Sequence, residues 1–453
     1  MISLADPCQA PYLAAPMTTD VLARSTIRRV AWRLLPLMFL AFVANFVDRV
    51  NVSVAALQMN RDLGLSAAAY GLGAGMLSIG YTLFQVPSNL MLARVGARRW
   101  IATLMLVWGV IASGMLLVRG AASFYAMRFL LGAAEAGFFP GMMLYLTYWF
   151  PGAVRARAVA AFMTAIPVAQ ALGTFVSGQL LGMQGLGLTG WQWLFLIEGM
   201  PSIVIGVLVF KLLPDRPESA AWLPDAERRW LHETLQREGA PTDPGRPTPL
   251  GPALRNPQVW WLGSIWACIN LIGFGQLYFL PQIIKGASLL SDVAVARLAS
   301  LPPLIAAAAM WLIASHSDRT GERRRHLAGA VLISAGGFVA TGVLVQSPGL
   351  ATVGLVFVAI GIAGSFGPFW GLVTAMLGGS AAEIALISSI GQIGAPAGSY
   401  LAGRVRDATG GFTIALLAFA ALAVLAAALT ALRWAGTPAS GGPSSPARTR
   451  TPT

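Results

Sequence analysis

Residues 34–57 read LLPLMFLAFVANFVDRVNVSVAAL, and this stretch decides the class of fold. A bilayer core of about 30 Å takes roughly 20 apolar helical residues, so the stretch is long enough to cross a membrane as one helix. Near its middle, however, lie two charged residues, Asp48 and Arg49, and two amides, Asn45 and Asn51. A charge inside a membrane span costs about 3 kcal/mol or more and is by default a candidate for function. The stretch therefore predicts an integral membrane protein with functional charges in its first span.

The composition of the whole chain agrees with this interpretation. Its 453 residues are 56% apolar and 11% charged, with a mean hydropathy of +0.68, whereas charged residues make up about a quarter of ordinary soluble domains. Cys8 and Cys268 are interpreted as free thiols, and no Cys/His cluster suggests a metal or haem site. No nucleophile and base pair or phosphate loop is evident, so neither an enzyme nor a cofactor is expected. The net charge of +13 is scattered in short groups, which argues against nucleic acid as a partner.

The fold class predicted from the apolar runs is an all-α integral membrane protein with twelve transmembrane helices in two six-helix bundles. Richness in Gly, Ala and Ser suits close helix contact in lipid, and the alternation typical of a β-barrel is missing. The predicted spans are 34–57, 69–93, 100–118, 124–146, 158–181, 193–213, 259–280, 298–314, 327–345, 350–377, 384–402 and 412–432.

The predicted organisation has two bundles and a charged linker. The segments are an N-terminal segment at 1–33, a bundle at 34–213, a linker at 214–257, a second bundle at 258–436 and a disordered tail at 437–453. In the linker, Asp225 is expected to cap a short helix in which Glu233 and Arg237 pair at i, i+4. We expect this helix to rest on the bundle or the membrane surface.

The orientation follows from the basic residues. Most of the 31 Lys and Arg residues fall on the face that holds both termini. By the positive-inside rule, both termini and the linker are cytoplasmic, in a bacterial-type inner membrane. The first 30 residues or so lack a continuous apolar core, so no cleaved signal peptide is evident.

The two halves resemble one another. The loop after the second predicted span reads NLMLARVGARR (89–99), and the loop after the eighth reads SDRTGERR (317–324). Arg94 and Gly96 recur 225 residues later as Arg319 and Gly321, and the same offset relates Asn45 to Asn270. A duplicated six-helix unit is the economical explanation.

These features resemble the major facilitator superfamily over nearly the whole chain. The loops are similar to its GxxxDRxGRR signature, although Asn89 replaces the first glycine and Ala93 the acid of the first copy. More narrowly, the chain resembles the anion:cation symporter family in DRVN (48–51), PSN (87–89), RFLLGAAEAGFFPG (128–141), GWQWLFLIEG (190–199) and LPDRP (213–217). The resemblance implies proton-coupled import of organic anions such as tartrate-like hydroxy acids, sugar acids, phthalate or hydroxyphenylacetate. It also implies that Arg49 anchors the substrate, that Asp48 and Glu135 take up protons, and that Arg128 couples the two.

Four charges are predicted at similar depth in the membrane. A rise of 1.5 Å per residue places Asp48 and Arg49 about 4.5 Å outward of the midplane, Glu135 near it, and Arg128 about 10 Å outward. Gly132, between Arg128 and Glu135, is expected to leave a hollow that a ligand can enter. The alternative is a purely structural role, in which Asp48 with Arg49, and Arg128 with Glu135, form neutralising pairs that only lock helices together.

The same four charges suit a reaction in which an anion and a proton enter together. The planar fork of an arginine matches a carboxylate and keeps its proton, whereas carboxyl groups can titrate. Burial and neighbouring arginines act on such a carboxyl in opposite senses, so small changes of geometry can switch its protonation. Protonation would release an arginine to accept the substrate, and deprotonation on the inner side would expel it.

Other polar residues are weaker candidates. For each one, hydrogen bonding between helices is at least as plausible as ligand contact. The predicted substrate-binding residues besides Arg49 are Asn45, Tyr81, Gln170, Asn270, Gln276, Trp370 and Gln392. Glu198 is expected near a span end, in a capping or loop-packing role. The loop residues Arg94, Arg98, Asp318, Arg319 and Arg323 are expected to latch the halves together on the inner side.

The function predicted is therefore a monomeric secondary transporter that imports a small organic anion with protons, driven by the proton gradient. Two alternatives stay open. One is a drug or cation exporter of the same fold, which two buried arginines disfavour. The other is a transport-derived sensor that binds an anion without moving it.

Overall fold

The computed structural model describes residues 15–238, 250–286, 288–344, 347–377 and 381–432. Cys8 and the predicted tail at 437–453 lie outside these described residues. The described part is almost entirely helical, which confirms the all-α prediction. In the first half the elements are α1 (Ala15–Asp62), α2 (Ala67–Val95), α3 (Ala97–Gly114), η1 (Met115–Leu117), α4 (Ala121–Glu135), α5 (Phe138–Trp149), α6 (Gly152–Met163), α7 (Ala165–Leu180) and α8 (Gly190–Leu212). After them come η2 (Pro217–Ser219), α9 (Asp225–Arg237), α10 (Leu250–Arg255), α11 (Pro257–Gly286), α12 (Asp292–Ala299), α13 (Leu301–Thr320), α14 (Arg323–Val343), α15 (Pro348–Leu377), α16 (Ala381–Thr409) and α17 (Thr413–Ala431).

Eleven stretches of helix in the described chain are long and apolar enough to cross a membrane. Three of them are interrupted, so that α4 with α5, α6 with α7, and α12 with α13 each make one span. The predicted span at 384–402 lies within α16, which is not among the eleven. At 29 residues α16 is as long as α2, but Gln, Ser, Gly and charged residues lower its hydropathy. It packs along α11 and α2, and its Gly391, Gly398 and Ser399 are buried.

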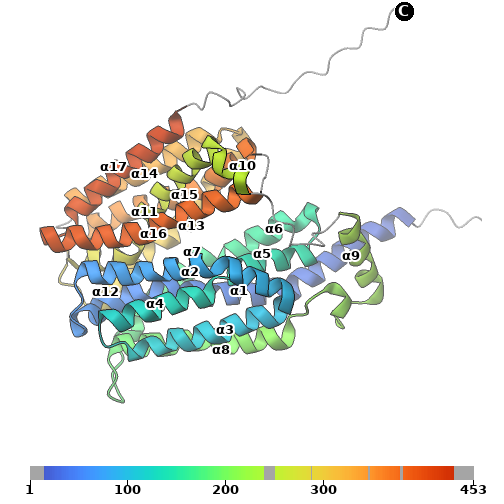
Figure 1. Cartoon of the computed structure of the whole chain (residues 1–453), viewed down its shortest axis with the longest axis horizontal. Helices are drawn as coiled ribbons and strands as arrows, with labels where there is room; N and C mark the ends of the chain where they lie inside the picture. The colour runs from blue at the N-terminus through green and yellow to red at the C-terminus, as the bar shows by residue number, and fades with distance from the viewer. Residues whose placement is uncertain (1–14, 239–249, 287, 345–346, 378–380, 433–453) are drawn as a thin grey trace, which may run out of the picture.

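The helices form two groups, which are confirmed as the two bundles of the predicted fold (Figure 1). Helices α1 to α8 pack with one another, and α11 to α17 form the second group. Linker helix α9 lies beside the start of α1, where Glu227 pairs with Arg29 at 3.0 Å. Glu233 and Arg237 pair at 3.1 Å as predicted. The predicted cap was wrong, because Pro224 precedes the helix and Asp225 is its first residue, paired with Arg228 at 3.3 Å.

The molecule has two ends, named here by their residues. At the gate end α1 ends, α2 begins and α16 ends, while at the basic end the loops at 94–99 and 317–325 join α2 to α3 and α13 to α14. In these two loops Gly96 and Gly321 terminate α2 and α13 with φ of 92° and 69°. A side chain would strain either backbone. The repeated glycines therefore occupy equivalent positions, as a duplicated unit requires.

The two halves are bonded to each other at the gate end. The hydroxyl of Tyr70 donates to the carbonyl of Tyr278 at 2.9 Å. The backbone N–H groups of Ala67 and Ala68 donate to the two carboxylate oxygens of Asp407 at 2.9 and 2.8 Å. Further bonds join Gln58 to Asp292, Asn60 to Gln282, and Arg297 to Gln179. These contacts close the molecule at the gate end.

Candidate functional site

The centre of the candidate site is an ion pair between two helices of the first half, α1 and α4. Arg49 Nε donates to Glu135 Oε2 at 2.6 Å. The Glu135 side chain is fully buried, whereas 19% of the Arg49 side chain is exposed. The guanidinium also lies over the ring of Tyr81 from α2, 4.6 Å from its centroid. Arg49 is thus partly exposed, and its guanidinium contacts a buried acid and an aromatic face.

Glu135 is placed by an interruption in its span. It is the last residue of α4, and α5 begins three residues later at Phe138, with Pro140 in its first turn. Proline prevents a regular helix from continuing through this point. Gly132, one turn before Glu135, does not leave the predicted hollow, because a Cβ there would lie 2.0 Å from the carbonyl oxygen of Leu77. The glycine instead allows α2 and α4 to touch backbone to backbone.

Arg128 has no carboxylate within ion-pair distance among the described residues. It is fully buried, and its guanidinium donates at 3.5 Å to the carbonyls of Asp48 and Ala74 and to the Tyr278 hydroxyl. It therefore touches α1, α2 and α11 at once. The alternative pairs, Asp48 with Arg49 and Arg128 with Glu135, are not observed. Arg49 pairs with Glu135 instead, so that neither Asp48 nor Arg128 has an ion-pair partner among the described residues.

Asp48 points away from Arg49, into the first bundle. Its Oδ2 accepts a hydrogen bond from the Ser202 hydroxyl of α8 at 2.7 Å, and its side chain is buried. On the same helix as Ser202, Glu198 accepts from the Ser177 hydroxyl of α7 at 2.8 Å. The expectation that Glu198 lies near a span end was wrong, because it lies near the middle of α8 and is 5% exposed. It is a third buried carboxyl group close to Asp48.

A small cavity lies between the halves on the gate side of Arg49. It has a volume of about 30 Å³, which is room for about one water molecule. It is lined by Ser53, Gln170, Thr174, Gln276, Leu277, Leu280, Pro281, Pro303 and Ala359. The structure therefore brings together two predicted site residues, Gln170 and Gln276, from opposite halves.

The other predicted site residues are spread more widely. Asn45 is buried on α1, one turn from Arg49. Asn270 is buried and donates to the carbonyl of Trp266 in its own helix at 2.8 Å. Trp370 belongs to an aromatic cluster, with its ring centroid 5.4 Å from that of Trp266. Gln392 is half-buried on α16.

Three of the predicted latch residues, Arg98, Asp318 and Arg323, make contacts that do not join the two bundles. The Arg98 N–H donates to Asp215 Oδ1 at 2.9 Å, and its guanidinium donates to the carbonyl of Phe210 at 2.6 Å. Asp318 pairs with Arg323 at 3.1 Å, while Arg94 and Arg319 are exposed. Asp215 was quoted from the sequence only as part of LPDRP (213–217) and given no role, yet it supplies a carboxylate to the loop in which Ala93 replaces the acid. The latch stays a prediction for a state in which the basic end is closed.

Comparison with known proteins matches the chain to a family model. The model described as Major Facilitator Superfamily matches residues 37–383. A protein of Agrobacterium vitis named "Putative tartrate transporter" is 44% identical over 424 residues, covering 91% of this chain and 92% of that protein. A Pseudomonas putida protein named "Putative metabolite transport protein NicT" is 37% identical over 401 residues, covering 88% and 92%.

The arrangement of helices is also similar to that of solved structures. A bacterial homologue of the human lysosomal transporter Spinster, crystallised in an inward-facing and unoccupied conformation, superposes with a TM-score of 0.74. The sequence identity is 18%, and the match covers 88% of this chain and 96% of that one. At this identity the likeness supports the fold.

Proposed function

The chain belongs to the Major Facilitator Superfamily, and from that premise we propose that it imports a small organic anion together with protons. It is a membrane transporter and not an enzyme. The proposed cargo is a carboxylate, such as a tartrate-like hydroxy acid, a sugar acid or an aromatic acid. The name of the Agrobacterium relative supports the first of these. The proton gradient is the proposed source of energy, with no cofactor.

The observation that carries the proposal is the pairing of a partly exposed arginine with a buried acid. Arg49 is fixed by Glu135 at 2.6 Å and still has 19% of its side chain exposed. A substrate carboxylate that approaches Arg49 competes with Glu135 for the same guanidinium. Protonation of Glu135 removes that competitor, because a neutral carboxyl no longer attracts the guanidinium as an ion. Substrate and proton are therefore bound together in this proposal.

Charge balance supports the same coupling. Within the first-half spans that the structure describes, the charged groups around the site are two arginines, the partly exposed Arg49 and the buried Arg128, and three buried acids, Asp48, Glu135 and Glu198. If all three acids were ionised, one negative charge would be left without a counterpart, which is costly in a low-dielectric interior. One bound proton makes the five groups neutral in total. Each negative charge that the substrate brings then requires one further proton to keep the site neutral.

The proposed orientation places the basic end in the cytoplasm, following the positive-inside rule. The gate end then faces outward and is closed by the contacts of Tyr70 with Tyr278 and of Asp407 with α2. In this orientation the described state is closed toward the outside. Transport requires that these contacts break while the loops at the basic end come together.

Two other functions make different predictions. A cation exporter would require its substrate to bind beside the positive charge of Arg49, which attracts an anion instead. A sensor would bind the anion without exchanging it across the membrane. The proposal therefore requires two observations: that an anion binds at Arg49, and that the protein exchanges this anion across the membrane.

The experiment is counterflow in liposomes after a binding screen. Melting temperatures of the purified protein against a panel of carboxylates and organic cations identify the ligand, because a ligand that binds the folded state stabilises it. Liposomes loaded with unlabelled ligand should then accumulate the labelled form. Arg49→Ala should abolish both, and Arg49→Lys should lower affinity about 10- to 100-fold through loss of the planar fork. Arg229→Ala, at an exposed position of α9, is the matched control.

Three results would overturn the proposal. Stabilisation by cations and not by carboxylates would favour the exporter. Carboxylate binding without counterflow would favour the sensor. Full carboxylate affinity in Arg49→Ala would remove Arg49 as the anchor.

A further inference from the structure

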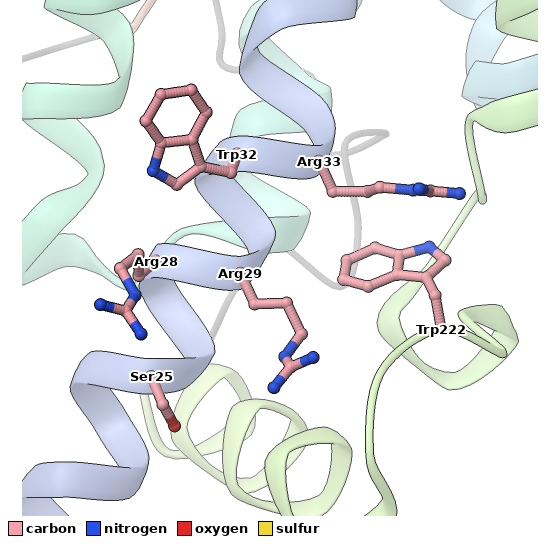
Figure 2. A pocket seen from close by; sticks show the side chains of 6 residues that line it. All are labelled: Ser25, Arg28, Arg29, Trp32, Arg33 and Trp222. Atoms are coloured by element: carbon pink, nitrogen blue, oxygen red, sulfur yellow. The ribbon is translucent and has the colours of Figure 1, made fainter.

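A second cavity lies at the basic end, about 440 Å³ in volume and separate from the transport site. It is lined by Ser25, Arg28, Arg29, Trp32 and Arg33 of α1 and by Trp222 of the linker. Figure 2 shows Arg29 and Arg33 extending from α1 toward Trp222, with Arg28 and Trp32 on the neighbouring side of the helix. The cavity thus combines three guanidinium groups with two indole rings.

The positive charge of this cavity is only partly neutralised. Arg29 pairs with Glu227 of α9 at 3.0 Å, and Ser25 donates to the other oxygen of that carboxylate at 3.0 Å. Arg28 and Arg33 are exposed, and neither has an ion-pair partner in the part of the chain that the structure describes. Two positive charges are therefore available to an anion.

The length of α1 sets the depth of the cavity in the membrane. Helix α2 has 29 residues, about 43 Å, which matches a bilayer of about 40 to 45 Å with its headgroups. Counting the same number back along α1 from Asp62 reaches Leu34. Arg33 therefore lies at the level of the headgroups, and Ser25 lies about 12 Å beyond it, in water.

The two tryptophans fit the same depth. Trp32 is 77% exposed, which is unfavourable in water but common at a membrane surface, where an indole lies among the headgroups. Trp222 is held in place from behind, since its ring stacks on that of the fully buried Trp149 with centroids 5.9 Å apart. One wall of the cavity is therefore rigid, and the other is an indole that faces the lipid interface.

We propose that this cavity binds the headgroup of an anionic phospholipid, whose phosphate is held by Arg28 and Arg33. Arginine matches the phosphate geometry with paired N–H donors, and an anionic leaflet attracts basic residues at this depth. The lipid then bridges the start of α1 and the linker at Trp222. A membrane lipid explains the exposed Trp32 and the depth of Arg33, neither of which a soluble anion requires.

The test measures the melting temperature of the purified protein in a neutral detergent. Short-chain phosphatidylglycerol is titrated, with phosphatidylcholine of the same chain length and inorganic phosphate as separate arms. The parent should be stabilised by phosphatidylglycerol alone. Arg28→Gln/Arg33→Gln should lose that shift, with affinity for the lipid about 30-fold lower. Arg99→Gln/Arg229→Gln removes the same charge from exposed basic-end positions outside the cavity and should keep the shift.

The remaining outcomes overturn the proposal. An equal shift with phosphatidylcholine would mean that the anionic headgroup is not recognised. An equal shift with inorganic phosphate would assign the cavity to a soluble anion. Equal losses in the two double variants would mean diffuse attraction without a site. If the first double variant unfolds on extraction, Arg28→Lys/Arg33→Lys keeps the charges and should retain part of the lipid shift, and a complete loss there would contradict the charge contribution.

Discussion

Glu135 and Arg49 are joined at 2.6 Å, although Glu135 shares a helix with another arginine, Arg128, one seven-residue repeat away. The pair crosses from α4 to α1, so it depends on how the two helices face each other. Arg128 is left with carbonyl and hydroxyl acceptors at 3.5 Å. The two arginines are therefore not equivalent, and only Arg49 is both ion-paired and partly exposed.

Replacing Glu135 by Gln should uncouple the anion from the proton. The amide imitates a protonated carboxyl, so Arg49 is released at every pH and anion affinity should no longer fall as the pH rises. Uptake driven by a pH gradient should be lost, while exchange of labelled for unlabelled anion persists. Glu233→Gln, at an exposed position of α9, is the control. Gradient-driven uptake equal to that of the parent would show that Glu135 is not the coupling residue.

Glu198 offers a different test, because its partner is a hydroxyl and not an arginine. Glu198→Gln keeps a hydrogen-bonding group opposite Ser177 and should leave both the melting temperature and counterflow near those of the parent. Glu198→Ala leaves the Ser177 hydroxyl without its partner and opens a void, which should cost about 1–3 kcal/mol of stability. If the Gln variant folded normally but failed to transport, the ionised form of Glu198 would be needed in the cycle.

Asp407 should hold the gate end closed through its charge. Partial burial acts to raise the pKa of Asp407, but hydrogen bonds from the N–H groups of Ala68 and Ala67 outweigh it and keep the pKa below its usual value. The closed gate therefore prefers the ionised carboxylate. Its stabilisation is complete above the ordinary pKa of about 3.9 and is lost as the pH falls through the lowered value. Between pH 5 and 8 this contact should not respond to pH.

Asp407→Asn should weaken the gate at all these pH values. Removing the negative charge of Asp407 from the start of α2 should destabilise the closed gate by about 1 kcal/mol, which is about a fivefold shift toward the open gate. Spin labels at the exposed positions Arg61 and Leu289, one in each half, report the change as a longer distance population. Asp62→Asn, which leaves the bonds to α2 intact, is a nearby control. An unchanged distance distribution in Asp407→Asn would show that the cap does not hold the gate.

The positions of the spans and of the charged site were predictable, because both follow from the cost of placing polar groups in lipid. Apolar length alone located the helices, and charge within apolar runs singled out Arg49 and Glu135. The partner of Arg49 was not predictable, since it depends on the rotation of α4 about its axis. Glu198 was misplaced because α8 begins at Gly190, three residues before the predicted span, which moves Glu198 toward the middle of the helix.

The role predicted for Gly132 failed for a related reason. A glycine between two charged residues leaves space in one helix, but a sequence does not tell what fills that space. Here the backbone of α2 fills it. The acid missing at Ala93 is similarly replaced by Asp215, which is distant in sequence and reaches Arg98 only through the packing of α8 beside α3.

Alanine substitutions at two tightly packed glycines, Gly132 and Gly71, distinguish the stability of one half from the strength of the contact between the halves. A Cβ at Gly132 would lie 2.0 Å from the Leu77 carbonyl within the first half, whereas a Cβ at Gly71 would lie 2.1 Å from the Ser399 carbonyl of the second half. Gly132→Ala should therefore lower stability by about 1–3 kcal/mol, because the clash persists in every state. Gly71→Ala should leave the melting temperature nearly unchanged, since the halves can part at the gate end and relieve the clash.

The label pair at Arg61 and Leu289 should then show the open gate in Gly71→Ala and the closed gate in Gly132→Ala. The reverse pattern would mean that the contact of α2 with α16 does not separate during the cycle, which would contradict the rocking of two rigid bundles.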